Sequence, residues 1–113
     1  MLWTMLFHPD LVDEFDAFDT AVQTSMLAHV ALLKQFGPTL GRPAVDTLKG
    51  STVTNLKELR FNAAGQVWRL AFAFDGNRVA VLLAAGDKGG TNQTRFYKAL
   101  ITSAEERWST WIV

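Results

Sequence analysis

The stretch WRLAFAFDGNRVAVLLAAG, residues 68–86, decides the fold of this chain. Its first half alternates large apolar residues with arginine and alanine, which is the period of a strand with two different faces. Asp75-Gly76-Asn77 is a strong hairpin signal, and the unbroken apolar run from Val79 to Ala85 is typical of a buried strand. The pattern therefore predicts two antiparallel strands, at about Val67–Phe74 and Val79–Ala85.

The rest of the chain supplies both helices and strands. Apolar residues recur at three- and four-residue steps from Asp10 to Phe36, which is long for one helix, so we expect two helices with a break near Thr24 and Ser25. Residues 37–52 show no clear period and are expected to form a long, ordered loop. The remaining predicted elements are strands at 2–8 and Asn55–Phe61 and a last helix at Arg95–Trp108.

This order, β-α-α-β-β-β-α, predicts an α+β fold: a small antiparallel sheet with helices packed on one face. The length of 113 residues suits a single domain spanning 1–113. Cysteine is absent and there are two histidines, so we expect no metal site and no cofactor. No apolar run reaches 18 residues, which predicts a protein without a membrane span, and the composition suits the cytoplasm.

Charge is segregated along the chain although the net charge is zero. Every charged residue before Lys34 is acidic, whereas from Lys34 onward eleven basic residues face six acidic ones. A polyanion can meet a locally positive surface on a neutral molecule, because salt screens exposed charges beyond about 8–10 Å. Ordinary scatter of surface charge is the alternative interpretation.

Strand parity places Glu58, Arg60 and Arg69 on one face of the sheet, opposite Trp68 and the other large apolar residues. Small side chains are expected to leave this face open. Lys57 has the wrong parity to join the group, although it can reach around an edge. The alternative is a solvated salt bridge between Glu58 and an arginine, which contributes roughly 0–1 kcal/mol.

The segment GDKGGTNQTRFY, residues 86–97, follows the buried strand and adds Lys88, Asn92, Arg95 and Tyr97. Its glycines and polar residues are also what any turn before a helix requires. We expect Lys88 and Arg95 to converge with the two arginines and Glu58, with Tyr97 near them. Such a group suits a phosphodiester, because arginine binds phosphate oxygens in a bidentate manner and lysine supplies a point charge.

Several motifs in this order resemble the RelE/ParE superfamily of bacterial toxins, in its phage-related HigB-like branch. The matching motifs are GPTLGRPAVDTLKGS, NLKELR, WRLAFAFD, VLLAAGDKGG and RFYKAL, and the resemblance extends from about Phe15 to Trp111. It implies a small antiparallel sheet with two helices on one face and a further helix at the end. It also implies a cognate antitoxin, often of helix-turn-helix type, as a partner.

The resemblance implies ribosome-dependent cleavage of messenger RNA without metal, by attack of a 2′-hydroxyl on the adjacent phosphate. By position, Arg69 matches an arginine that contacts the scissile phosphate, Lys88 a basic residue, and Tyr97 an aromatic that stacks or transfers a proton. Glu58 and Arg60 match positions where relatives carry lysines or a glutamate base. The implied catalytic residues are thus Arg69, Lys88, Glu58 and Tyr97, and the implied RNA-binding residues are Arg60, Lys57, Arg95 and Asn92.

Two features depart from the ribosome-dependent toxins. The sequence pI of about 6.7 is low for a protein attracted to ribosomal RNA, and no histidine follows His29, whereas several relatives place one near the C-terminus. Two alternatives therefore stay open: a ParE-like inhibitor of DNA gyrase, and a non-catalytic module that binds an antitoxin. The sequence does not specify the codon, the antitoxin or the oligomeric state.

Overall fold

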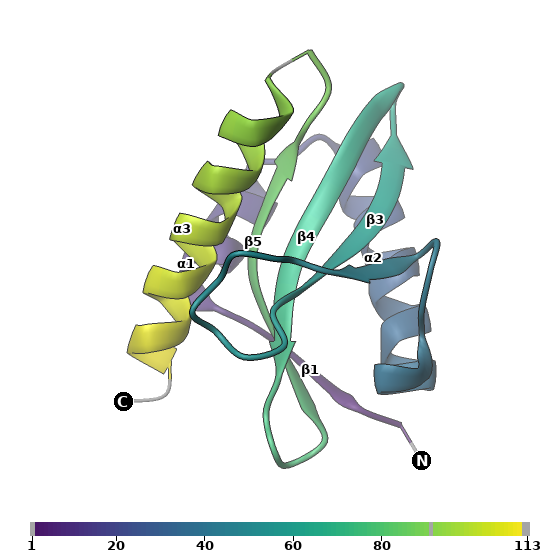
Figure 1. The fold of residues 1–113 in the computed structure, drawn as a ribbon. Coiled ribbons are helices and arrows are strands. Elements are labelled where there is room, and N and C mark those ends of the chain that lie inside the picture. The colour runs from purple at the N-terminus through teal and green to yellow at the C-terminus, as the bar shows by residue number, and fades with distance from the viewer. Residues whose placement is uncertain (1, 91, 112–113) are drawn as a thin grey trace.

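The computed structural model describes residues 2–90 and 92–111. One five-stranded sheet has the strand order β1-β5-β4-β3-β2 (Figure 1). The α+β fold and the predicted element order are confirmed, with one short strand, β2, added inside the expected loop. In chain order the elements are β1 Thr4–Phe7, α1 Pro9–Asp16, α2 Thr20–Phe36, the 3-10 turn η1 Gly37–Thr39, β2 Val45–Thr47, β3 Lys57–Ala63, β4 Gln66–Phe74, β5 Val79–Asp87 and α3 Gln93–Trp111.

The sheet is built on the predicted hairpin, in which β4 and β5 pair antiparallel. β1 runs parallel to β5, from Thr4↔Val79 to Phe7↔Leu82, so the expectation of a wholly antiparallel sheet is corrected at this edge. Residue periodicity specifies a strand and its faces but not its direction. α1 begins two residues after β1 and also contacts β5.

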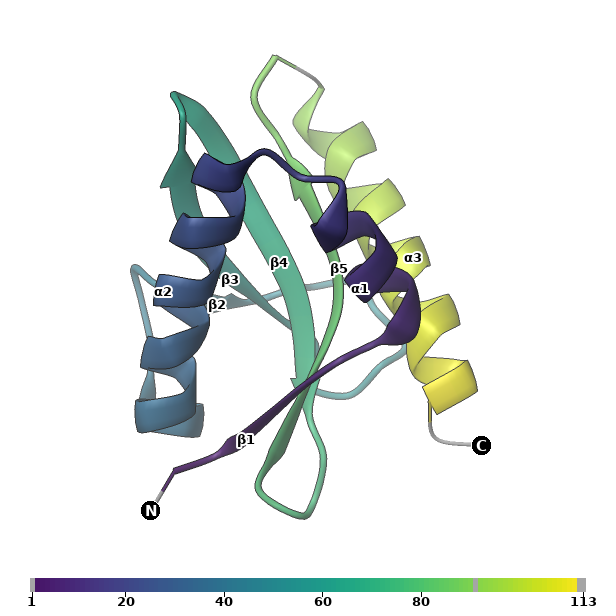
Figure 2. The ribbon, with the colours of Figure 1, turned by 180° about the vertical axis from the view of Figure 1, so that it is seen from behind.

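One face of the sheet packs against α1 and α2 (Figure 2). Trp68, Leu70 and Phe72 of β4 lie in this core, as their parity predicts. They meet buried apolar residues of the two helices: Leu11, Val22, Met26, Val30 and Leu33. Burial of such side chains is the main contribution to the stability of a domain of this size.

The opposite face is covered by α3, which lies in front of β5 in Figure 1. Leu100 and Ala104 of this helix pack in a second core with Ala71, Ala73 and Leu83 of the sheet. The helices therefore occupy both faces rather than one. The alanines of β4 were expected to leave an open surface, but their small volume lets the backbone of α3 approach closely.

The two N-terminal helices separate at residues 17–19, not near Thr24 and Ser25. The Ser25 hydroxyl donates to the carbonyl oxygen of Asn62 in β3 at 2.7 Å, so it ties α2 to the sheet instead of interrupting the helix. β3 starts at Lys57, two residues later than expected, because Asn55 adopts a left-handed conformation with φ of 58°. None of the described helices has the length and apolar character needed to span a bilayer.

Candidate functional site

Glu58 of β3 lies at the centre of a buried polar cluster that joins β3, β4 and α3. Its side chain is only 4% exposed. One carboxylate oxygen, Oε1, accepts a hydrogen bond from the Tyr97 hydroxyl at 2.7 Å and lies 3.3 Å from Arg69 Nε. The other, Oε2, accepts from Arg60 Nη2 at 3.1 Å. A buried carboxylate needs such partners, because its desolvation costs several kcal/mol.

Strand register explains why these residues meet. Arg60 and Arg69 are directly paired across β3 and β4, and Glu58 is paired with Ala71. Two facing guanidinium groups repel each other, and the carboxylate two residues along β3 compensates both. Ala71 leaves space above Glu58 for the ring that α3 brings in. The predicted shared face of Glu58, Arg60 and Arg69 is thus confirmed.

Arg69 lies beneath α3 and not on an open surface. The residue is 8% exposed, and its Nη1 donates to the carbonyl oxygen of Trp68 at 2.9 Å. Its Nε also donates to the Tyr97 hydroxyl oxygen at 3.2 Å. The helix that fills the alanine face is what covers Arg69, so the expectation of a guanidinium standing on a shallow surface is wrong. A guanidinium fixed in this way presents its charge without reorganisation.

Asp46 of β2 extends the cluster outward. It accepts hydrogen bonds from Arg60 Nη2 at 3.3 Å and from Arg42 Nε at 3.1 Å. The hydrogen bond from the Thr47 N–H lowers the pKa of Asp46, burial opposes this, and the two arginines lower it further. Burial acts to lower the pKa of Arg60, but the hydrogen bond and charge of Glu58, together with the charges of Asp46 and Tyr97, raise the pKa overall. Sequence reasoning missed Asp46, because the three-residue strand Val45–Thr47 is too short for a visible period.

Tyr97 is the group that α3 contributes. Burial raises its pKa, and donation to the Glu58 carboxylate raises it further, whereas Arg69 lowers it. The phenol therefore stays protonated well into the alkaline range. Lys88 Nζ lies 5.8 Å from the centre of the Tyr97 ring. Its backbone N–H donates to the Val67 carbonyl at 2.8 Å, which anchors Lys88 at the end of β5.

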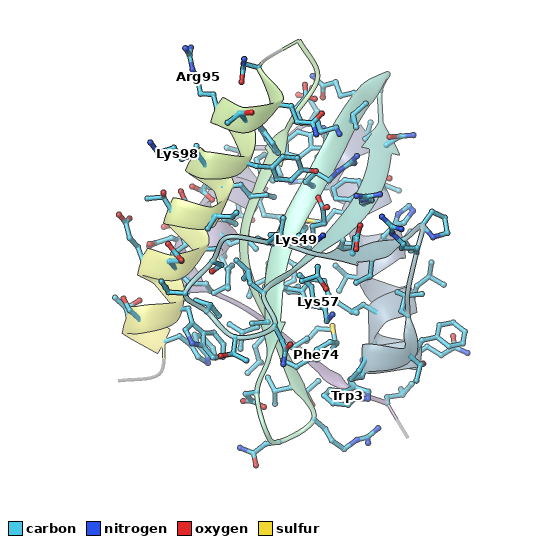
Figure 3. All side chains as sticks on the ribbon, viewed as in Figure 1. Trp3, Lys49, Lys57, Phe74, Arg95 and Lys98 are labelled. Carbon is cyan, nitrogen blue, oxygen red and sulfur yellow. The ribbon has the colours of Figure 1, made fainter. Side chains whose placement is uncertain are left out.

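Three predicted RNA-binding residues lie apart from this cluster. Arg95 is exposed and points away from the sheet (Figure 3), so the expected convergence of four cations reduces to Arg60, Arg69 and Lys88. Lys57 Nζ donates to Thr47 Oγ1 at 3.4 Å, in keeping with its opposite parity. Asn92 Oδ1 accepts from the Arg95 N–H at 3.1 Å and so caps the start of α3.

The glycines of the 86–90 segment serve the packing of α3. A Cβ atom on Gly86 would lie 3.1 Å from the Phe96 ring, so the missing side chain lets this helix sit close to β5. The Gly89 N–H donates to Asp87 Oδ1 at 2.8 Å, and Gly90 has a φ of 73°. Turn geometry therefore accounts for these residues.

Two hollows flank the cluster, and Arg60 lines both. The first, of about 320 Å³, is bordered by Glu58, Tyr97, Gln93 and Lys49, a cation that sequence reasoning missed. The second, of about 410 Å³, is bordered by Arg60, Arg69 and His29. A larger hollow of about 850 Å³ beside Trp108 is lined by Asp75 and Glu105 and by no cation in the part of the chain that the structure describes, so it suits a phosphate poorly. Within residues 2–90 and 92–111, no group of three or more potential ligands is placed to hold a metal ion.

Sequence comparison agrees with the resemblance drawn from the motifs. Residues 13–109 match the family described as "Phage derived protein Gp49-like". A Mycobacterium tuberculosis protein named "Putative toxin HigB3" is 42% identical over 108 residues, which cover 96% of this chain and 92% of that protein. "Putative toxin HigB2" of the same organism is 39% identical over 95 residues, covering 83% of this chain and 47% of that protein.

Structural comparison supports the fold. The free state of a mutant of the Escherichia coli toxin RelE, in which two arginines are replaced by alanine, superposes with a TM-score of 0.62. The superposition covers 90% of this chain and 96% of the RelE chain. The identity is 12%, so this likeness bears on the architecture alone. A RelE-like architecture, as the motifs predict, is therefore confirmed.

Proposed function

This chain belongs to the Gp49-like family of phage-derived proteins, and from this premise we propose that it is the toxin of a type II toxin-antitoxin pair, an endoribonuclease that cuts messenger RNA on the ribosome. The two HigB relatives, named as toxins, support the first part. The observation that carries the second is the cluster of Arg60, Arg69 and Lys88 around the Glu58–Tyr97 hydrogen bond. Three cations beside a proton-transferring pair suit a phosphodiester in an in-line displacement.

In the proposed reaction a ribose 2′-hydroxyl attacks the adjacent phosphorus. The bond from the 2′-oxygen to phosphorus forms, the bond to the 5′-oxygen breaks, and the products are a 2′,3′-cyclic phosphate and a 5′-hydroxyl. Arg69 and Arg60 stabilise the additional negative charge on the pentacoordinate phosphorus. Lys88 stabilises that charge from the end of β5 and protonates the leaving 5′-oxygen.

The proton of the 2′-hydroxyl travels through Tyr97. Glu58 is too enclosed to contact the ribose directly, since both of its oxygens are occupied by Tyr97 and the arginines. Tyr97 accepts the 2′-hydroxyl proton while it passes its own proton to Glu58 along the 2.7 Å hydrogen bond. Glu58 is then the final base, and Tyr97 is the group that touches the substrate.

The proposed partners are the ribosome with its messenger RNA and a cognate antitoxin of helix-turn-helix type, all in the cytoplasm. The antitoxin is expected to cover part of the sheet or α3. Copurification of the chain with the product of its neighbouring gene tests this part of the proposal. Recovery of the chain alone from cells that express both genes would count against an antitoxin partner.

One experiment separates the function classes. The protein is induced in growing cells, message ends are mapped, and plasmid supercoiling is measured, with Arg69→Lys as the impaired variant and Lys98→Ala as a surface control. Cut messages with unchanged supercoiling support the proposal. Altered supercoiling with intact messages would indicate a gyrase inhibitor, and unimpeded growth with a soluble, folded protein would indicate a binding module.

A further inference from the structure

We propose that the hollow of about 410 Å³ along the outer edge of β3 is a binding subsite for a second nucleotide, next to the scissile phosphate. The proposal rests on the proposed function, since it takes single-stranded RNA as the ligand. It adds His29 and Asn62 to the surface that contacts the substrate, with the buried Phe61 ring packed behind His29. None of the three belongs to the cluster around Glu58.

The position of the hollow follows from the short length of β2. β2 pairs with β3 from Lys57 to Leu59, and the Arg60 N–H donates to the Ala44 carbonyl at 2.8 Å. Beyond Arg60 the edge of β3 has no strand partner among the described residues. The hollow lies along this edge, between α2 and the segment that leads into β2. Arg60 and Arg69 line it as well, and Arg60 also lines the hollow beside Tyr97. A strand of RNA with a phosphate at the two arginines therefore has a continuous path into this second hollow.

The lining matches both parts of a nucleotide. His29 stacks on Phe61 with ring centres 5.6 Å apart and an interplanar angle of 29°, which leaves its other face available for a base. Its Nδ1 contacts the Ser25 carbonyl at 2.7 Å and so carries the proton, which leaves Nε2 as an acceptor in the plane of the ring. The Asn62 amide offers a donor and an acceptor. Aromatic side chains hold bases of single-stranded RNA in the same manner.

Basic side chains are the charged groups on the wall of the hollow, and each is also paired with a carboxylate of the cluster. Among the described residues, the hollow is lined by two arginines and by no acidic side chain. Arg60 Nε is buried and has no hydrogen-bond partner in the described part of the chain, although Nη2 of the same group serves two carboxylates. An unused donor on a guanidinium is costly unless a ligand uses it. A phosphate oxygen that draws Arg60 from Asp46 would engage it.

Binding of uncleavable RNA tests the subsite without reference to catalysis. Fluorescence anisotropy measures the affinity of the full chain for a 2′-O-methyl dinucleotide and a 2′-O-methyl tetranucleotide. Wild type is expected to bind the tetranucleotide more tightly. His29→Ala should weaken tetranucleotide binding by about tenfold and leave dinucleotide binding within about twofold, in line with the loss of one stacking contact. His29→Phe, which keeps a ring, should retain most of the affinity.

Gln35→Ala is the matched control, because Gln35 is an exposed residue of α2 outside the hollow. Thermal unfolding of each variant shows whether the fold is kept. Tetranucleotide binding by folded His29→Ala at the wild-type level would overturn the subsite, as would equal loss for both lengths. Weaker binding of the antitoxin with unchanged RNA binding would make the hollow a protein-docking site and overturn the proposal. A wild type that binds both RNAs as expected but cuts no message would refute the nuclease and leave the subsite standing.

Discussion

The Tyr97 hydroxyl donates a 2.7 Å hydrogen bond to Glu58 Oε1, and Arg69 Nε lies within 3.3 Å of both oxygens. These contacts join α3 to β3 and β4 through the Tyr97 phenol. They make the charge arrangement of the cluster depend on the position of α3, since the ring and its helix move together. A ligand or partner that displaces α3 would separate Tyr97 from Glu58, which are the proton relay and the final base of the proposed reaction.

The titration of Tyr97 can be observed directly, because it is the only tyrosine in the chain. Burial and the Glu58 hydrogen bond raise its pKa above the ordinary value of 10.0, so the phenolate absorbance of the folded protein should appear at higher pH than in urea. Glu58→Gln should lower the midpoint of the Tyr97 titration, because the substitution removes the negative charge of Glu58. Burial should continue to raise the pKa of Tyr97 in this variant. Identical midpoints for folded and unfolded chains would contradict the buried geometry.

The free energy of unfolding should also depend on the ionisation of Tyr97. Between the unfolded pKa of 10.0 and the higher folded pKa, the native state keeps a proton that the unfolded state has lost. The contribution of Tyr97 is therefore complete below pH 10.0 and is lost as the pH rises through the folded pKa. When the free energy of urea unfolding is plotted against pH, the curves of wild type and Tyr97→Phe should approach each other above the unfolded pKa of Tyr97. Parallel curves through the alkaline range would refute the linkage.

Arg69→Lys tests the role of Arg69 in cleavage more directly than Arg69→Ala does. Arg69→Ala removes one partner of a buried ion pair and should cost about 3 kcal/mol of unfolding free energy, at the low end of the usual range because Arg60 still pairs with Glu58. Lysine keeps the charge but loses the planar fork, and cleavage should fall by about 10²-fold. A folded Arg69→Lys enzyme with the wild-type rate would remove Arg69 from the mechanism.

The sequence was informative where periodicity and parity decide the outcome. The alternation around Trp68 assigned the core face of β4, and parity placed Glu58 with Arg60 and Arg69. The sequence did not indicate which helix covers which face of the sheet. Small residues on the second face favour a bare surface and a closely packed helix equally well, so the burial of Arg69 was not predictable. Asp46 was missed because the three-residue strand Val45–Thr47 is too short to show a period, so its pairing with β3 was not predictable.

Trp68→Ala should act on the fold alone. The ring lies 4.9 Å from Phe18 and 6.2 Å from Phe61, on the face of the sheet away from the cluster. Truncation of a large core aromatic is expected to cost about 3–5 kcal/mol. Urea denaturation measures this change, and Lys98→Ala on the exposed side of α3 is the control (Figure 3). A loss below about 1 kcal/mol would mean that Trp68 lies outside the core.

Lys88→Ala tests whether the end of β5 takes part in the chemistry. The backbone of Lys88 holds the strand end through its bond to Val67, and alanine keeps that bond, so the fold should be unaffected. The lost ammonium group is within 5.8 Å of the Tyr97 ring, where it would meet charge that develops only in the transition state. Single-turnover cleavage on programmed ribosomes should fall by about 10²-fold, or about 2.7 kcal/mol, while ribosome binding stays near wild type.

Arg95→Ala is the matched control, because Arg95 is also basic but points away from the sheet. If Lys88→Ala and Arg95→Ala both cut at the wild-type rate, the 86–90 segment is a turn that positions α3, and the two arginines are the cations that remain to stabilise the phosphorane.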